Sequence, residues 1–294
     1  MNQHLNIPIL PKLKNIIESI ESNITFNMLE IGSLDINQPE DPFYQLLDLF
    51  PGSKLIGFEV NEEDCRKMNN EARPGAEFYP VALGEKNEIR KFYITEHQMC
   101  CSLYEPDESL NSLYQNLHYM NLKSITDIKT SNLNTFVKEN NIGIVDFIKI
   151  DIQGAELDVF KGGVETIKNV VAIVSEVEFI AQYKDQPLFG DICQYLQQSD
   201  LMFHKFLGLA GRALKPMVIN RDINFPGQHM FTDAMFIRQI QKLNDLSDHQ
   251  ILKLGLLACA YGSLDVTHYC LAKFDKRKGS KFTEMFMKEL ASCC

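Results

Sequence analysis

The sequence predicts an α/β fold built on a mostly parallel, doubly wound sheet. Short apolar runs alternate with helix-length amphipathic stretches from about residue 26 to about residue 240. Parallel strands need crossover segments of this length, and right-handed crossovers place the helices against the faces of the sheet. The chain has 294 residues, which is enough for one large α/β domain with an additional helical segment.

We expect three regions along the chain. Residues 1–25 form a helical lead-in, because their apolar residues recur at helical spacing. These residues are Leu10, Leu13, Ile16, Ile17 and Ile20. Residues 26–240 form the sheet domain, and residues 241–294 form a C-terminal helical segment in which Ser247 is a candidate N-cap.

The elements of the sheet domain follow from apolar runs and turn residues. Strands are predicted over residues 26–31, 54–60, 77–83, 145–150, 170–179, 201–206 and 234–238. Helices are predicted over residues 41–50, 61–71, 133–140 and 190–198, and one more follows a turn at 151–154. The apolar stripe of that helix is Leu157, Phe160, Val164 and Ile167. Asn61 is a candidate N-cap, since the acids that follow it suit the positive end of a helix.

Composition excludes several classes of protein. The net charge of −10 argues against a protein that binds nucleic acid through its phosphates. No apolar run reaches the roughly 18 residues that a membrane span needs, so we expect no stable membrane insertion. The eight cysteines lack metal-ligand or redox spacing, and the chain does not begin like a secretory signal. These features favour free thiols and a cytoplasmic location.

Two strand ends favour a nucleoside-type cofactor. Open parallel sheets bind ligands beyond the carboxyl ends of their strands. Gly32 follows the first strand and lets the backbone approach a ligand closely. Glu59 ends the second strand, 27 residues after Gly32, where a carboxylate can accept two hydrogen bonds from a ribose diol. Taken alone, Gly32 is also explained by a structural turn, and Glu59 by an acid that caps the following helix.

Two further strand ends carry charged pairs. Lys149 and Asp151 share one face of their strand, because alternate residues point the same way. A structural ion pair is the alternative explanation. Glu176 and Glu178 also share a face, and two carboxyls leaving a buried strand together raise each other's pKa, as in sites that handle protons. A solvent-exposed strand end is the alternative there.

The segment DFIKIDIQGAELDVFKGG, residues 146–163, resembles the signature of the FkbM family of S-adenosylmethionine-dependent methyltransferases. The segment EVEFIAQYKDQPLF, residues 176–189, is similar to the strand and turn that follow in that family. Further similar segments fall in the expected order, namely LEIGS (29–33), GFEVN (57–61), PVALGE (80–85) and CSLYEP (101–106). The resemblance covers roughly residues 26–238.

The resemblance implies a class I methyltransferase (Rossmann-like) doubly wound sheet, mostly parallel with an antiparallel last strand. It also implies S-adenosylmethionine as the cofactor. Glu30 and Gly32 would cradle it, Glu59 would bind the ribose, and Asp151 would lie near the sulfonium. The remaining implied cofactor positions are Ser33 in the cradle, Val60 beside Glu59, Val81 and Ala82 along the adenine, and Ser102 in a covering loop.

One position departs from the family pattern. The cofactor loop of methyltransferases usually carries a second glycine four residues after the first, and Ile36 stands there in this chain. A Cβ restricts positive φ and crowds a close ligand. We therefore expect the loop to take a different path or to bind the cofactor more weakly.

The predicted reaction is O-methylation of a hydroxyl on a small molecule, sugar or glycan. It needs a base for the hydroxyl proton, and the candidates in order are Asp151, Glu176, Glu178 and His204. We expect no bound metal, because no histidine lies among these acids. A metal held by Asp151 with Glu176 or Glu178 is the less favoured alternative.

Three rival functions remain at this stage. The main alternative is a non-catalytic cofactor-binding or scaffold domain of the same fold. An oxidoreductase is disfavoured because no GxGxxG follows the first strand, and a nucleic-acid methyltransferase because of the acidic charge. A homodimer stays open.

Overall fold

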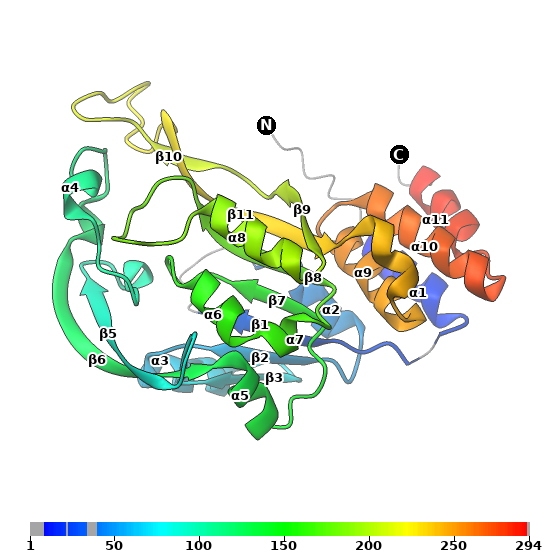
Figure 1. Ribbon diagram of the computed structural model, residues 1–294. Coiled ribbons are helices and arrows are strands. Elements are labelled where there is room, and N and C mark those ends of the chain that lie inside the picture. The colour runs from blue at the N-terminus through cyan, green and yellow to red at the C-terminus, as the bar shows by residue number, and fades with distance from the viewer. Residues whose placement is uncertain (1–8, 22, 34–39, 293–294) are drawn as a thin grey trace.

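The computed structural model describes residues 9–21, 23–33 and 40–292. An eight-stranded sheet forms the centre of the molecule (Figure 1). Its order is β10-β11-β8-β7-β1-β2-β3, and β9 also pairs with β11. The strands are β1 (Asn27–Ile31), β2 (Lys54–Phe58), β3 (Ala76–Tyr79), β7 (Phe147–Ile150), β8 (Ala172–Glu178), β9 (Leu201–Phe206), β10 (Ala210–Arg212) and β11 (Gln228–Arg238).

The strand order is that of a class I methyltransferase. Strands β3, β2, β1, β7 and β8 are parallel, whereas β11 runs antiparallel to both β8 and β9. From β1 the chain adds β2 and β3 on one side of the sheet and then β7 and β8 on the other. The loops after β1 and β7 therefore diverge. A doubly wound sheet binds ligands at such a switch point. The predicted fold class is confirmed.

Helices cover both faces of the sheet. They are α1 (Ile9–Glu18), α2 (Tyr44–Leu49), α3 (Glu62–Glu71), α4 (Glu108–Asn111), α5 (Leu133–Glu139), α6 (Glu156–Gly162), α7 (Val164–Ile167), α8 (Phe189–Gln198), α9 (Asp248–Ala260), α10 (Leu264–Lys278) and α11 (Phe282–Ala291). Short 3-10 helices span Gln98–Cys100, His118–Met120 and Ile240–Asp245. Among the described residues, no helix is both long and apolar enough to cross a membrane.

Alternate residues of the central strands enter two separate cores. Met28 of β1 and Phe147 of β7 pack with α1, α2 and the C-terminal helices α9–α11. Their neighbours Leu29 and Ile148 pack on the other face with α5–α8. The alternation arises because successive side chains of a strand point to opposite faces, and both faces of a parallel sheet are covered.

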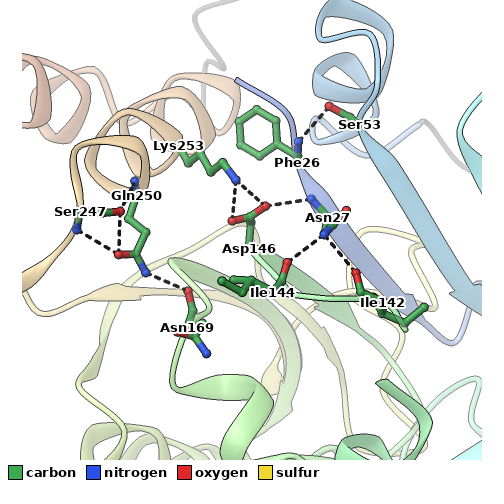
Figure 2. Close-up of polar contacts among 10 residues, drawn as sticks. All are labelled: Phe26, Asn27, Ser53, Ile142, Ile144, Asp146, Asn169, Ser247, Gln250 and Lys253. Carbon is green, nitrogen blue, oxygen red and sulfur yellow. Dashed lines mark hydrogen bonds and ion pairs between the residues drawn. The ribbon is translucent and has the colours of Figure 1, made fainter. Parts of the chain in front are cut away.

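The C-terminal helices are fixed to the sheet by a buried ion pair. Lys253 of α9 donates to both carboxylate oxygens of Asp146 at 2.8 Å, and Asp146 also accepts the backbone amide of Asn27 (Figure 2). Asp146 precedes β7 and Asn27 begins β1, so the contact lies at the amino ends of these strands. The segment thus packs on the sheet, and the division of the chain at residues 25 and 240 stays a prediction.

The region of residues 77–132 differs from the sequence prediction. The single strand expected over residues 77–83 is two strands, β3 and β4 (Ala82–Gly84), which belong to different sheets. Pro80 separates them, and proline cannot donate to a strand ladder. β4 pairs with β6 (Leu122–Asn132), which pairs with β5 (Glu88–Thr95), and neither long strand was predicted. This ribbon extends to one end of the molecule, opposite the C-terminal helices (Figure 1).

The helix predicted after residue 154 is interrupted. It forms α6, which ends at Gly162, and α7, which begins at Val164, with Gly163 between them. A Cβ on Gly162 would lie 2.4 Å from the carbonyl oxygen of Gly84, so only glycine lets α6 pass this close to β4. Val164, which was assigned to the apolar stripe, is consequently 39% exposed.

Candidate functional site

Three clefts meet at the carboxyl edge of the central sheet. Their volumes are about 390, 310 and 550 Å³, and we call them the first, second and third cleft in that order. Among the described residues, Asp151 and Met99 line all three. Any two ligands bound in neighbouring clefts would therefore meet at these two side chains.

Asp151 is held at this junction by the ends of β1 and β7. Its backbone amide donates to the carbonyl of Ile31 at 2.9 Å, which continues the pairing of the two strands. Gly32 turns away with a φ of +85°, and a Cβ there would lie 1.9 Å from the carbonyl oxygen of Asp151. The glycine is required by this close approach, so the structural explanation of Gly32 applies whether or not a ligand also approaches it.

The first cleft combines an apolar lining with a carboxylate. Val60, Val81 and Ala82 line it together with Phe92 of β5, so the ribbon closes one side. Glu59, 7% exposed, also lines it and accepts the backbone amide of Asn61 at 2.7 Å. Burial raises the pKa of Glu59. Asn61 in turn caps α3 by accepting the amides of Glu63 and Asp64, as predicted.

The second cleft is polar. Glu30 accepts the hydroxyl of Tyr44 at 2.7 Å, and burial raises the pKa of Glu30 to about 7. Lys149 donates to Asp233 of β11 at 2.8 Å, so its charge is neutralised by a residue other than Asp151. Ser33 lines this cleft, yet its hydroxyl holds the chain turn by donating to the carbonyl of Glu30 and accepting the amide of Phe58.

Asp151 and Glu176 are joined by one amide group. The Nε2 atom of Gln153 donates to Asp151 at 2.9 Å and to Glu176 at 2.7 Å, and its Oε1 atom accepts the hydroxyl of Tyr183 at 3.0 Å. Gln153 adopts a φ of +59°, a left-handed conformation that costs free energy for a non-glycine residue. Burial and the neighbouring charges of Asp151 and Glu178 raise the pKa of Glu176 well above its usual value.

Two further buried carboxyls, Glu156 and Glu178, lie near this turn, and Glu156 holds its backbone. Glu156 accepts the backbone amides of Ile152 and Gly154, at 2.8 and 3.3 Å, and burial raises the pKa of Glu156 to about 7. Glu178 is 1% exposed and does not belong to the described lining of the three clefts. Burial raises its pKa well above the usual value. The sequence grouped Glu178 with Glu176. In the structure Glu176 lines the third cleft, whereas Glu178 is not among the described lining residues.

Carboxylate oxygens of Asp151, Glu156 and Glu176 lie within 4.8 Å of one another, a spacing that could hold a cation. Each of these carboxylates already accepts hydrogen bonds from protein amides, those of Gln153 or of the turn backbone. Amide donors thus use carboxylate oxygens that would otherwise be available to a metal ion. The spacing of the three carboxylates is therefore not sufficient evidence for a metal site.

The structure brings most of the predicted site residues together. Nine of them line the clefts or their junction, namely Glu30, Gly32, Ser33, Glu59, Val60, Val81, Ala82, Asp151 and Glu176. Ser102 is 1% exposed and donates to the carbonyl of Gln153 at 2.7 Å, so its hydroxyl fastens the covering loop to the turn. Ile36 lies outside the described residues.

His204 is not brought to this site. Its Nε2 atom lies 2.8 Å from the hydroxyl of Ser263, which precedes α10, and burial lowers the pKa of His204. It is absent from the described lining of the three clefts. Alternation along β9 could not reveal this, because the partner of the imidazole lies 59 residues further along the chain.

Sequence analysis missed three residues at the junction. Met99 lies in the short 3-10 helix Gln98–Cys100, and Asp233 lies in the part of β11 that was not predicted. Gln153 lay in the predicted turn after Asp151, and no periodicity marks a turn residue. Its position two residues after a candidate base was the one available signal.

The strand order and the clefts at the carboxyl edge define a class I methyltransferase. The chain belongs to the FkbM methyltransferase family, because the family model described as "Methyltransferase FkbM domain" matches residues 30–203. S-adenosylmethionine is the cofactor that this family and fold imply. The apolar first cleft with the Glu59 carboxylate fits a nucleoside, and the polar second cleft fits an amino-acid moiety.

Three known proteins show a distant similarity to the chain. It is 25% identical over 171 residues to the 2-O-methyltransferase NoeI of Sinorhizobium fredii (strain NBRC 101917 / NGR234), covering 55% of this chain and 65% of that protein. Among solved structures, magnesium protoporphyrin IX methyltransferase from Synechocystis PCC 6803 with bound SAM has a TM-score of 0.35 at 8% identity, covering 78% of this chain and 77% of that one. Sp1610 of Streptococcus pneumoniae has a TM-score of 0.35 at 10% identity, covering 95% and 98%. The fold assignment therefore depends on the strand order of this chain and on its family.

Proposed function

We propose that the protein is an S-adenosylmethionine-dependent O-methyltransferase that acts on a hydroxyl of a small molecule, sugar or glycan. The observation that carries this proposal is the position of Asp151, which lines the first, second and third clefts together. A cofactor spanning the first two clefts and an acceptor in the third would meet at its carboxylate. The similarity to a 2-O-methyltransferase supports transfer to oxygen.

The cofactor would occupy the first and second clefts. Glu59 would accept hydrogen bonds from the ribose hydroxyls, and Val60, Val81 and Ala82 would contact the adenine. Gly32 leaves the backbone bare beside the cofactor, and Glu30 would accept hydrogen bonds from its ammonium group. Ser33 and Ser102 would shape the site through the backbone contacts described above. When bound, S-adenosylmethionine supplies a methyl group already activated on a sulfonium.

The protein then has two tasks, to orient the acceptor hydroxyl and to remove its proton. Asp151 is the proposed base, because its carboxylate lies where the acceptor and cofactor clefts join. Gln153 fixes this carboxylate and Glu176 in one arrangement through its two N–H bonds. Glu176 lines the third cleft and is the second candidate, whereas the surroundings of Glu178 and His204 do not favour either as the base.

Thermal unfolding of the purified protein, titrated with S-adenosylmethionine and with S-adenosylhomocysteine, tests this function. A ligand at 100 times its dissociation constant stabilises the native state by about 2.7 kcal/mol, so a saturable rise in the melting temperature is expected with both compounds. ATP serves as the control ligand, because it carries adenine and ribose without a methionine moiety. No rise with either sulfur compound would favour the non-catalytic alternative.

A further inference from the structure

The third cleft has an acidic lining. Its described lining residues include Asp151, Glu176 and Asp233 but no lysine or arginine. Carboxylates accept hydrogen bonds, and a deprotonated carboxylate cannot donate one. Hydroxyl or amine donors of a ligand can therefore pair with these acids, and an anionic ligand meets negative rather than positive potential.

The nearest cations are directed to other partners. Lys149 is buried and donates to Asp233 at 2.8 Å, and Asp233 lines both the second and the third cleft. Arg212 donates to the hydroxyl of Tyr119 at 2.9 Å and to the carbonyl of Gly211 at 2.7 Å. Asp233 thus stands between the third cleft and the ammonium group of Lys149.

The remaining lining suits a polyhydroxylated molecule. Tyr119 and Phe231 present aromatic rings, which contact the apolar C–H faces of such a molecule. The raised pKa of Glu176 means that this group keeps a proton at a pH where an exposed carboxyl has lost it. A protonated carboxyl both donates and accepts, and so does a hydroxyl.

We propose that the third cleft binds an uncharged polyol, such as a sugar with neighbouring hydroxyls, and excludes acceptors that carry a phosphate, sulfate or carboxylate beside the reacting hydroxyl. One hydroxyl would face Asp151 and a neighbouring one Glu176 or Asp233. Anions are rejected because the carboxylates of Asp151 and Asp233 repel them and the described lining holds no lysine or arginine to bind them. This inference rests on the proposed function, since it places the acceptor at Asp151.

The test is a binding panel on the full chain saturated with S-adenosylhomocysteine. Saturation-transfer NMR would measure D-glucose and the methyl glycosides of mannose, galactose and fucose against D-glucose 6-phosphate, D-glucuronate and D-glucosamine. At least one neutral sugar is expected to bind at least tenfold more tightly than both anionic sugars. Equal binding of an anionic sugar, weaker binding of the amino sugar than of both anionic sugars, or no binding of any neutral sugar would each overturn the proposal.

The variant Asp233→Asn should shift the preference of the third cleft toward anionic sugars. The variant keeps the size of the side chain but exposes the third cleft to the unneutralised ammonium of Lys149. The affinity for D-glucose 6-phosphate relative to D-glucose should rise at least tenfold, and an unchanged ratio would contradict the proposal. The matched control is Asp127→Asn, which removes an exposed carboxylate paired with Lys91 on the β5–β6 ribbon and should leave the ratio unchanged. If Asp233→Asn does not fold, the wild-type panel decides alone.

The proposed cofactor binding and the proposed selectivity of the third cleft can be tested separately. Binding of S-adenosylhomocysteine is measured first on the same protein. A protein that does not bind it contradicts the proposed function. A protein that binds it but takes neutral and anionic sugars equally contradicts only the assignment of the third cleft.

Discussion

The side-chain amide of Gln153 lies 2.7 Å from the carboxylate of Glu176, and its second N–H bond reaches Asp151 at 2.9 Å. Two carboxyls that leave neighbouring parallel strands are thus held apart and oriented by one neutral group. Such a bridge reduces the repulsion between the two acids without introducing a cation that would attract anionic ligands.

Gln153→Ala should lower kcat by about 10- to 100-fold, because hydrogen bonds to charged groups are worth about 1.5–3 kcal/mol. It should also move the acidic limb of the pH–rate profile to higher pH, since the charge of Asp151, no longer bridged by the amide, raises the pKa of Glu176 further. Gln197→Ala, on the exposed surface of α8, is the control. A lower rate with an unmoved pH profile would mean that Gln153 has only a structural role.

Glu59→Ala should weaken the affinity for S-adenosylhomocysteine by about 10- to 100-fold, for the same range of hydrogen-bond energies. Isothermal titration calorimetry measures this directly. Glu63→Ala is the matched control, because that carboxylate lies nearby at the start of α3 but is 70% exposed. Unchanged affinity in Glu59→Ala would place the ribose elsewhere.

Gly32→Ala should destabilise the fold by about 1–3 kcal/mol, because its φ of +85° is strained for any residue with a Cβ. The added Cβ would also collide with the carbonyl oxygen of Asp151, 1.9 Å away. Gly190→Ala in α8 is the control, since no atom lies within 4 Å of a Cβ there, and its stability should hold or rise slightly. Denaturant unfolding that ranks the two variants equally would contradict the close approach of β1 and β7.

Stability should fall as the pH rises from about 4.5 to about 7. Burial raises the pKa of Glu30 to about 7 from an ordinary value of 4.5, so in this window the folded state binds more protons than the unfolded state. The stabilising effect of the protonated form is complete below the unfolded pKa and is lost as the pH rises through the folded pKa.

In Glu30→Gln the free energy of unfolding should fall less over this pH range than in the wild type, by an amount on the order of 3 kcal/mol. Urea unfolding at a series of pH values provides the measurement, and Glu88→Gln on the exposed face of β5 is the control. A pH dependence that is as steep in Glu30→Gln as in the wild type would show that Glu30 is not the buried acid responsible.

The parallel core and its strand ends were predictable from the sequence because they depend on local patterns. Apolar runs of strand length mark β1, β2, β7 and β8, and alternation then places Asp151 and Glu176 at the same edge of the sheet. Asn61 and Ser247 carried the capping chemistry that begins α3 and α9. Predicting these elements does not require knowing which residues far along the chain they contact.

The parts that were missed depend on pairing across long stretches of chain. Most residues of β5 and β6 are exposed or half-buried, so neither strand forms an apolar run, and each is stabilised by pairing with the other. Lys149 was paired with Asp151 by their shared strand face, but its partner Asp233 comes 84 residues later from β11. His204 was likewise judged by its intrinsic pKa, whereas Ser263 determines its position.

Methyl transfer by Asp151→Asn, measured together with its affinity for S-adenosylmethionine, tests the central claim most directly. The isosteric amide keeps the hydrogen-bonding shape of the junction but cannot take a proton from the acceptor hydroxyl. Turnover should be abolished, while calorimetry should give cofactor binding close to that of the wild type. Turnover at the wild-type rate in this variant would contradict the assignment of Asp151 as the base at the meeting point of the three clefts.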